Sequence, residues 1–162
     1  MRLKHVDIYI THNVRGFKTE HGTYGYTLTF QKQDGELKTI EDYASVGETT
    51  QNGIILTAME KALGRMTTAC EIVIYEDSAY IANMFSMGQL RTWYVNGFRN
   101  AKGKKVVDAD KWREIEKLCR QHVVTVEFYT HHAFTDHMKY EIRKRIGSVN
   151  KNAGDSGEEK TG

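Results

Sequence analysis

Residues 70–81 read CEIVIYEDSAYI, and this stretch decides the fold. Residues 70–76 form a mostly apolar run of the kind found in strands at the centre of a sheet. Asp77 and Ser78 follow at once with side chains that cap helices, so we expect a helix to begin here and to end near Gly88. A buried strand that leads directly into a helix is typical of a sheet covered by helices.

Upstream of this stretch, the sequence predicts three strands joined as an antiparallel meander. Polar and apolar residues alternate most clearly over residues 24–32, and Asp34-Gly35 is a hairpin turn signal. The polar residues 12–22 indicate a loop. The expected strands cover residues 4–11, 24–32 and 36–45.

On the other side, apolar residues recur at helical spacing in several segments. The expected helices cover about residues 51–66, 89–96, 108–122 and 135–146, with a basic loop at 97–107 and a strand at 123–128. The order βββ-α-β-α-α-α-β-α implies an α/β fold: a mixed five-stranded sheet, with three antiparallel strands and then two parallel strands, flanked by helices. We expect one domain over residues 1–146 and a disordered C-terminal tail over residues 147–162, which has no apolar face.

The composition fits one soluble globular domain. The chain has 162 residues, of which 40% are hydrophobic and 27% charged, and no run approaches the roughly 20 apolar residues that cross a bilayer. The charged N-terminal residues are unlike a signal peptide, and Cys70 and Cys119 are expected to be reduced, so we expect a cytoplasmic monomer without membrane contact. The net charge of +2 is too small to indicate nucleic-acid binding by itself.

Several strings, in their order and spacing, resemble type 1 ribonuclease H over about residues 5–146. They are Val6-Asp7-Ile8-Tyr9, Thr49-Thr50-Gln51-Asn52, residues 70–81, Trp93-Tyr94-Val95-Asn96-Gly97-Phe98 and Asp110-Lys111-Trp112. The resemblance implies the ribonuclease H-like fold and hydrolysis of the RNA strand of RNA–DNA hybrids by two Mg²⁺ ions among four carboxylates. Such a pair of ions needs hard oxygen ligands and negative charge around it.

The resemblance places its four carboxylates at Thr11, Ile55, Asp77 and Glu141 of this chain. Only the last two are acidic, and Glu141 corresponds only if the family's loop histidine is His131. A threonine hydroxyl is a poor, neutral ligand, and isoleucine offers none. We therefore expect a degenerate active site in which the metal-dependent nuclease is impaired or absent, with Asp77 and Glu141 as weak metal ligands.

Two alternatives to this interpretation stay open. In the first, a rearranged site of Asp77, Glu141 and either His131 or His132 holds Mn²⁺ or Mg²⁺ and still cleaves hybrids. In the second, the scaffold is a protein-interaction module that no longer binds nucleic acid. The histidine-rich segment 131–137 also suggests Zn²⁺ binding, although its histidines and acid match no known spacing of zinc ligands. For Asp77, the simpler interpretation is that it caps the helix that follows.

A second set of positions points to a nucleic-acid partner, either RNA–DNA hybrid or duplex. Residues 91–105, which we call the basic handle, contain no acidic residue, and basic side chains on phosphates give salt-sensitive affinity. The alternative is a solvated loop whose aromatic residues pack in the core. The candidate binding residues of the handle are Arg91, Trp93, Arg99, Lys102, Lys104 and Lys105.

The start of the first helix supplies the remaining binding candidates. By resemblance, Thr50, Gln51 and Asn52 touch phosphate and the minor groove, whereas their alternative role is to cap the helix. The loop after the first strand departs from the family pattern, and its Arg15 and Lys18 are further candidates for phosphate contact.

Overall fold

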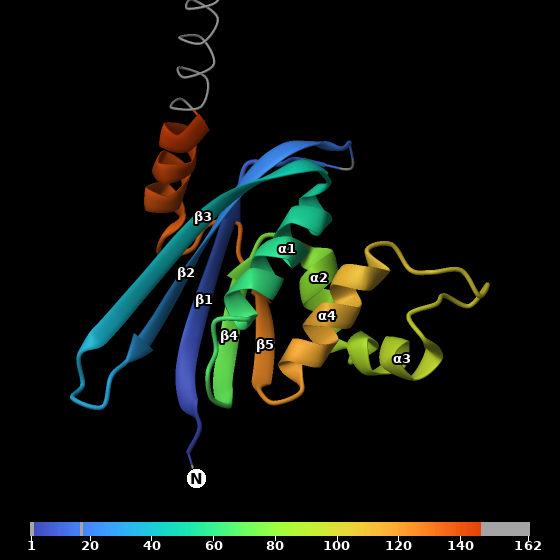
Figure 1. The fold of residues 1–162 in the computed structure, drawn as a ribbon, viewed down its shortest axis with the longest axis horizontal. Coiled ribbons are helices and arrows are strands. Elements are labelled where there is room, and N and C mark those ends of the chain that lie inside the picture. Colours follow the sequence, from blue (N-terminus) through green and yellow to red (C-terminus); the bar gives the residue numbers. More distant parts are fainter. Residues whose placement is uncertain (1, 17, 147–162) are drawn as a thin grey trace, which may run out of the picture.

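The computed structural model describes residues 2–16 and 18–146, so the tail expected at 147–162 lies outside the described residues. The fold is built on one five-stranded sheet with the strand order β3-β2-β1-β4-β5 (Figure 1). The strands are β1 (Lys4–His12), β2 (Glu20–Gln31), β3 (Leu37–Thr49), β4 (Cys70–Glu76) and β5 (Val123–Phe128).

The pairing of the strands confirms the predicted mixed sheet. β1 and β3 each pair antiparallel with β2, whereas β4 pairs parallel with β1 and with β5. β4 therefore has partners on both edges, and its Ile72 and Ile74 are fully buried, which accounts for the apolar run that identified it. β2 and β3 extend beyond the prediction because their pairing continues to Glu20 opposite Thr49, through an irregularity at His21/Gly22.

Helices cover the sheet unevenly. Figure 1 shows α1 (Gln51–Leu63), α2 (Ala79–Ser86), α3 (Gln89–Asn96) and α4 (Ala109–Cys119) gathered on one side, while the helix over residues 135–146 stands apart near one end of β2 and β3. α1 packs against β1, β2 and α4 and forms the centre of the core. Within the described ranges, no helix is long and apolar enough to cross a membrane.

Two helices end earlier than their apolar spacing predicts. α1 stops at Leu63, where the N–H of Gly64 closes the last turn on Glu60. α4 stops at Cys119, because the imidazole of His122 turns toward β4 and its Nδ1 accepts a hydrogen bond from the Cys70 N–H (3.0 Å). That bond holds the start of β5 beside the start of β4.

Candidate functional site

Three segments that are distant in sequence meet at the carboxyl end of β4. Gln51, the first residue of α1, donates from Nε2 to the carbonyl oxygen of Asp77 (3.2 Å) and from its backbone N–H to that of Gly16 (3.3 Å). Ser78 Oγ donates to Asn52 Oδ1 (2.7 Å). The end of β1, the start of α1 and the end of β4 therefore form one junction, at the edge where sheets of this kind place their sites.

The capping residues of this junction are settled by their hydrogen bonds. Thr50 caps α1, because its Oγ1 accepts from the N–H of Gly53 (3.1 Å). Ser78 caps α2 in the same way by accepting from Ile81. Asp77 is thus free of a capping role and faces a pocket.

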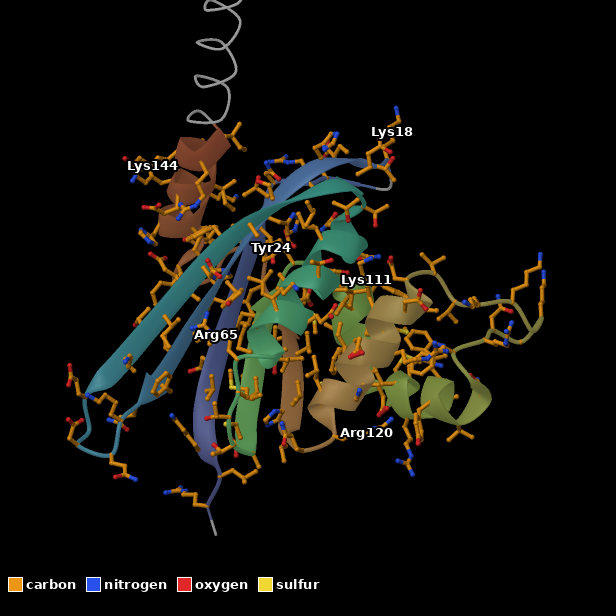
Figure 2. The ribbon with its side chains drawn as sticks, in the orientation of Figure 1. Lys18, Tyr24, Arg65, Lys111, Arg120 and Lys144 are labelled. Carbon is orange, nitrogen blue, oxygen red and sulfur yellow. The ribbon has the colours of Figure 1, made fainter. Side chains whose placement is uncertain are left out.

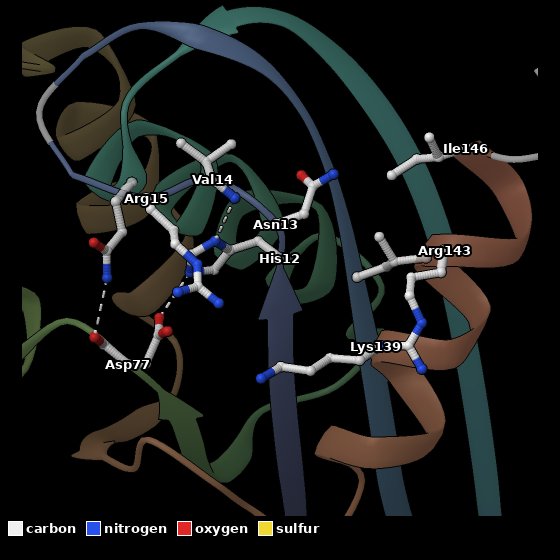
Figure 3. A pocket seen from close by; sticks show the side chains of 10 residues that line it. His12, Asn13, Val14, Arg15, Asp77, Lys139, Arg143 and Ile146 are labelled. Carbon is white, nitrogen blue, oxygen red and sulfur yellow. Dashed lines mark hydrogen bonds and ion pairs between the residues drawn. The ribbon is translucent and has the colours of Figure 1, made fainter. Parts of the chain in front are cut away.

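The pocket has a volume of about 570 Å³ (Figure 3). Asp77 is the only carboxylate among the described residues that line it, and Arg15, Lys139 and Arg143 supply three positive charges. Figure 3 shows Arg15 entering from the loop after β1, with Lys139 and Arg143 on the helix over residues 135–146 across from it. With His12 neutral, the lining carries a formal charge of +2, three cations against one anion.

Asp77 is engaged by a histidine that sequence reasoning missed. His12 Nε2–H donates to Asp77 Oδ1 at 2.7 Å, while His12 Nδ1 accepts from the N–H of Val14 (3.2 Å). Burial by itself would raise the pKa of the Asp77 carboxyl, but the hydrogen bond from His12 holds that pKa below its ordinary value. The position of His12 could have indicated this contact, because His12 ends β1, and β1 lies parallel and next to β4, the strand that Asp77 follows.

Thr11, at the first predicted carboxylate position, belongs to a closed buried cluster. Its hydroxyl donates to the sulfur of Met138 (3.6 Å) and lies 3.0 Å from His132 Nε2. That nitrogen also donates to the carbonyl oxygen of Ile10 (3.0 Å), and His132 Nδ1 accepts from Phe134 (3.1 Å), so both imidazole nitrogens are occupied. Burial lowers the pKa of His132 and keeps it neutral. Neither Thr11 nor His132 offers a free ligand atom to the pocket.

Ile55, at the second position, is fully buried in α1, and Glu76, the acid that ends β4, is buried as well. Glu76 is 0% exposed; its Oε2 accepts from the N–H of Ser78, and its Oε1 has no hydrogen-bond partner among the described residues. Burial raises the pKa of Glu76 to about 8, so the side chain is mainly protonated at neutral pH. Sequence reasoning did not single out Glu76, since a Glu at the end of a strand is usually exposed.

The remaining acid and histidine candidates lie elsewhere. Glu141 accepts from Arg145 Nη1 (2.7 Å), and the Arg145 guanidinium stacks over the Tyr43 ring on β3. His131 is exposed and pairs with Asp136 (3.0 Å). Glu141 and His131 therefore do not join Asp77 in the pocket. Across residues 2–16 and 18–146, no three His, Cys, Asp or Glu side chains are grouped closely enough to hold a metal ion.

The basic handle consists of the last residues of α3 and a short hairpin over residues 97–105 that projects beyond α3 and α4 (Figure 1). An isolated bridge pairs Arg99 with Lys105, and the side chain of Asn100 accepts from the N–H groups of Lys102 and Lys104 (2.9 and 3.1 Å). All four basic side chains are exposed, as is Arg91 on α3. The handle thus presents its cations to solvent from a fixed backbone.

One handle residue does not have the predicted place. Trp93 is only 6% exposed, because it packs against Trp112 with ring centroids 5.1 Å apart. Phe98 is likewise buried. Trp93 therefore anchors the handle to the core and is not accessible for stacking on a base.

Comparison with known proteins gives the same fold. Ribonuclease H of Chlorobaculum parvum is 39% identical over 77 residues, which are 48% of this chain and 53% of that protein. The chain thus spans about half the length of this relative. Among solved structures, LC9-RNase H1, a type 1 RNase H with the type 2 active-site motif, superposes with a TM-score of 0.72 at 19% identity, over 91% of this chain and 74% of its own.

A second solved structure is a foamy viral protease-reverse transcriptase in complex with RNA/DNA hybrid, with a TM-score of 0.61 at 20% identity over 78% of this chain and 17% of the viral one. At these identities the structural likeness establishes the fold. The RNase H family itself matches residues 13–139, well over half of the sequence. The chain belongs to the RNase H family.

Proposed function

We propose that this RNase H family member binds nucleic acid, either RNA–DNA hybrid or duplex, and that its metal-dependent nuclease activity is impaired or absent. One observation carries the proposal: the pocket at the carboxyl end of β4 holds a single carboxylate, Asp77, and three cations. A site for paired divalent ions needs the opposite balance of charge.

The donor set does not fit two Mg²⁺ ions. Mg²⁺ takes oxygen ligands in near-octahedral geometry, and two neighbouring ions need several carboxylates to offset their repulsion. Here Asp77 already accepts from His12, the Thr11 hydroxyl is directed to the Met138 sulfur, and position 55 is an isoleucine. The residues of this pocket therefore do not support metal-dependent hydrolysis.

Nucleic-acid binding is supported by features that remain accessible. The handle exposes Arg99, Lys102, Lys104 and Lys105 on an ordered hairpin, and these cations make no ion pair with any acid in the described part of the chain. Unpaired cations on a fixed loop suit phosphate contacts. A structural neighbour of this chain is a viral enzyme in complex with RNA/DNA hybrid.

A paired binding and cleavage experiment tests the proposal. Fluorescence anisotropy in EDTA should detect binding of a labelled RNA–DNA hybrid that weakens steeply between about 50 and 200 mM salt. The Lys104→Gln/Lys105→Gln variant should bind more weakly. A cleavage assay on the same hybrid with Mg²⁺ or Mn²⁺ should show at most trace product. Robust cleavage that is abolished by Asp77→Asn would refute the loss of activity, and salt-independent affinity would refute the phosphate contacts.

A further inference from the structure

The three cations of the pocket are drawn from two separate parts of the chain. Arg15 follows β1, whereas Lys139 and Arg143 lie one turn apart on the helix over residues 135–146. None of the three forms an ion pair with an acid of residues 2–16 or 18–146, although other side chains of the helix over residues 135–146 do. The pocket therefore concentrates positive charge that the fold leaves unneutralised.

This arrangement is unfavourable for the folded protein by itself. Like charges at i and i+4 on a helix, as at Lys139 and Arg143, destabilise it slightly. Glu141 lies between them in sequence but is directed to Arg145 instead. The single acid of the pocket, Asp77, has one oxygen occupied by His12. A cavity lined by three unpaired cations and a single carboxylate favours the binding of an anion.

We propose that this pocket binds a phosphate group of a nucleic-acid strand directly, through Arg15, Lys139 and Arg143, without a metal ion. The proposal rests on the nucleic-acid binding proposed above and assigns part of it to the pocket. Arg15 and Arg143 can each donate two parallel hydrogen bonds to phosphate oxygens, and Lys139 adds a compact charge. The apolar side chains of Val14 and Ile142 complete the lining beside them.

The role of His12 and Asp77 in this site is to set its charge. The His12 Nε2–H occupies the Asp77 oxygen that would otherwise attract a cation or an arginine of the pocket. Arg15, which Figure 3 shows on the same side of the pocket as this pair, then remains available for the ligand. Asp77 and His12 are thus positioning residues, and neither has to touch the phosphate.

The test compares single-charge variants by hybrid binding in EDTA over a series of salt concentrations. Arg15→Gln, Lys139→Gln and Arg143→Gln should each weaken binding several-fold at low salt. Because the three cations share one phosphate, each variant should reduce the slope of log affinity against log salt by at most about 0.9, the share of one phosphate contact. Lys144→Gln is the matched control, since this exposed lysine lies on the same helix outside the pocket (Figure 2) and should change neither quantity appreciably. Adding Mg²⁺ at constant ionic strength should not raise the affinity.

The outcomes separate this inference from the proposed function. If the three pocket variants bind like the wild type while Lys104→Gln/Lys105→Gln loses affinity, the protein binds nucleic acid but the pocket is not a phosphate site. If Mg²⁺ tightens binding and Asp77→Asn removes that effect, the pocket holds metal and the inference is wrong. If the wild type binds neither hybrid nor duplex, the proposed function itself fails. Circular dichroism of each variant confirms that it is folded.

Discussion

Replacing the buried acid Glu76 by glutamine should remove a loss of stability that develops between pH 5 and pH 8. The carboxyl has an ordinary pKa of 4.5, which burial raises to about 8 in the folded protein. Below pH 4.5 both the folded and the unfolded chain hold the proton, so the shift contributes nothing. Above it, the unfolded chain releases the proton and the folded chain does not, which costs about 1.4 kcal/mol of stability for each pH unit up to about 8.

By this reasoning the wild type loses about 3 kcal/mol of stability at pH 7, and about 4 kcal/mol by pH 8, through Glu76 alone. Glu76→Gln keeps an acceptor for the Ser78 N–H and cannot titrate. Its amide NH₂ would fall where Glu76 Oε1 has no partner, a cost of about 1–3 kcal/mol at every pH. The variant should therefore be less stable than the wild type near pH 5 and more stable near pH 8.

Urea denaturation followed by tryptophan fluorescence measures this difference, since Trp93 and Trp112 are both buried reporters. Glu127→Gln on the neighbouring strand β5 is the control, because Glu127 is exposed and its removal should leave the pH profile unchanged. If the stability curves of the wild type and Glu76→Gln run parallel from pH 5 to pH 8, Glu76 is not held protonated, and the account of this buried carboxyl is wrong.

Three other predictions concern the closed cluster beside the pocket. The His132 imidazole should titrate below its ordinary pKa of 6.5 in an NMR titration. In Glu76→Gln, which lacks the opposing effect of the buried carboxyl, stability should fall as the pH drops below about 6.5, because the unfolded chain takes up the His132 proton first. Met138→Ala should lower the free energy of unfolding by about 2–5 kcal/mol in urea denaturation and leave hybrid affinity nearly unchanged, since Met138 is fully buried. Thr11→Asp alone should stay inactive, whereas Thr11→Asp/Ile55→Glu/Met138→Asp should gain slow Mn²⁺-dependent hybrid cleavage that Asp77→Asn removes, as followed on denaturing gels.

Most of the fold could be predicted because its signals are local. The apolar run at residues 70–76 matches β4 residue for residue, and the helix over residues 135–146 was likewise placed correctly. The errors fell where tertiary contacts set the boundary. β2 begins at Glu20 because it pairs with β3 there, and α4 ends before His122 because that imidazole bonds across to β4.

The site was predictable only in part. The sequence located Asp77 and the convergence of three segments, but it did not connect Asp77 with His12 or place Arg15 across a pocket from Lys139. Those relations join side chains up to about 120 residues apart, and neither spacing nor periodicity encodes them. For Trp93 the sequence left contact with nucleic acid and packing in the core as alternatives, because whether an aromatic side chain in a basic segment faces solvent depends on its partner, here Trp112.

The contact between Thr11, His132 and Met138 also bears on how such a pocket can change over evolutionary time. A carboxylate introduced at position 11 would enter a space already filled by a thioether and an imidazole whose nitrogens are both committed. A carboxylate at position 11 alone would therefore cost stability without completing a metal site, and only simultaneous replacement of its neighbours would avoid that cost. The packing of this cluster thus makes it difficult for the pocket to gain acidic residues through single substitutions.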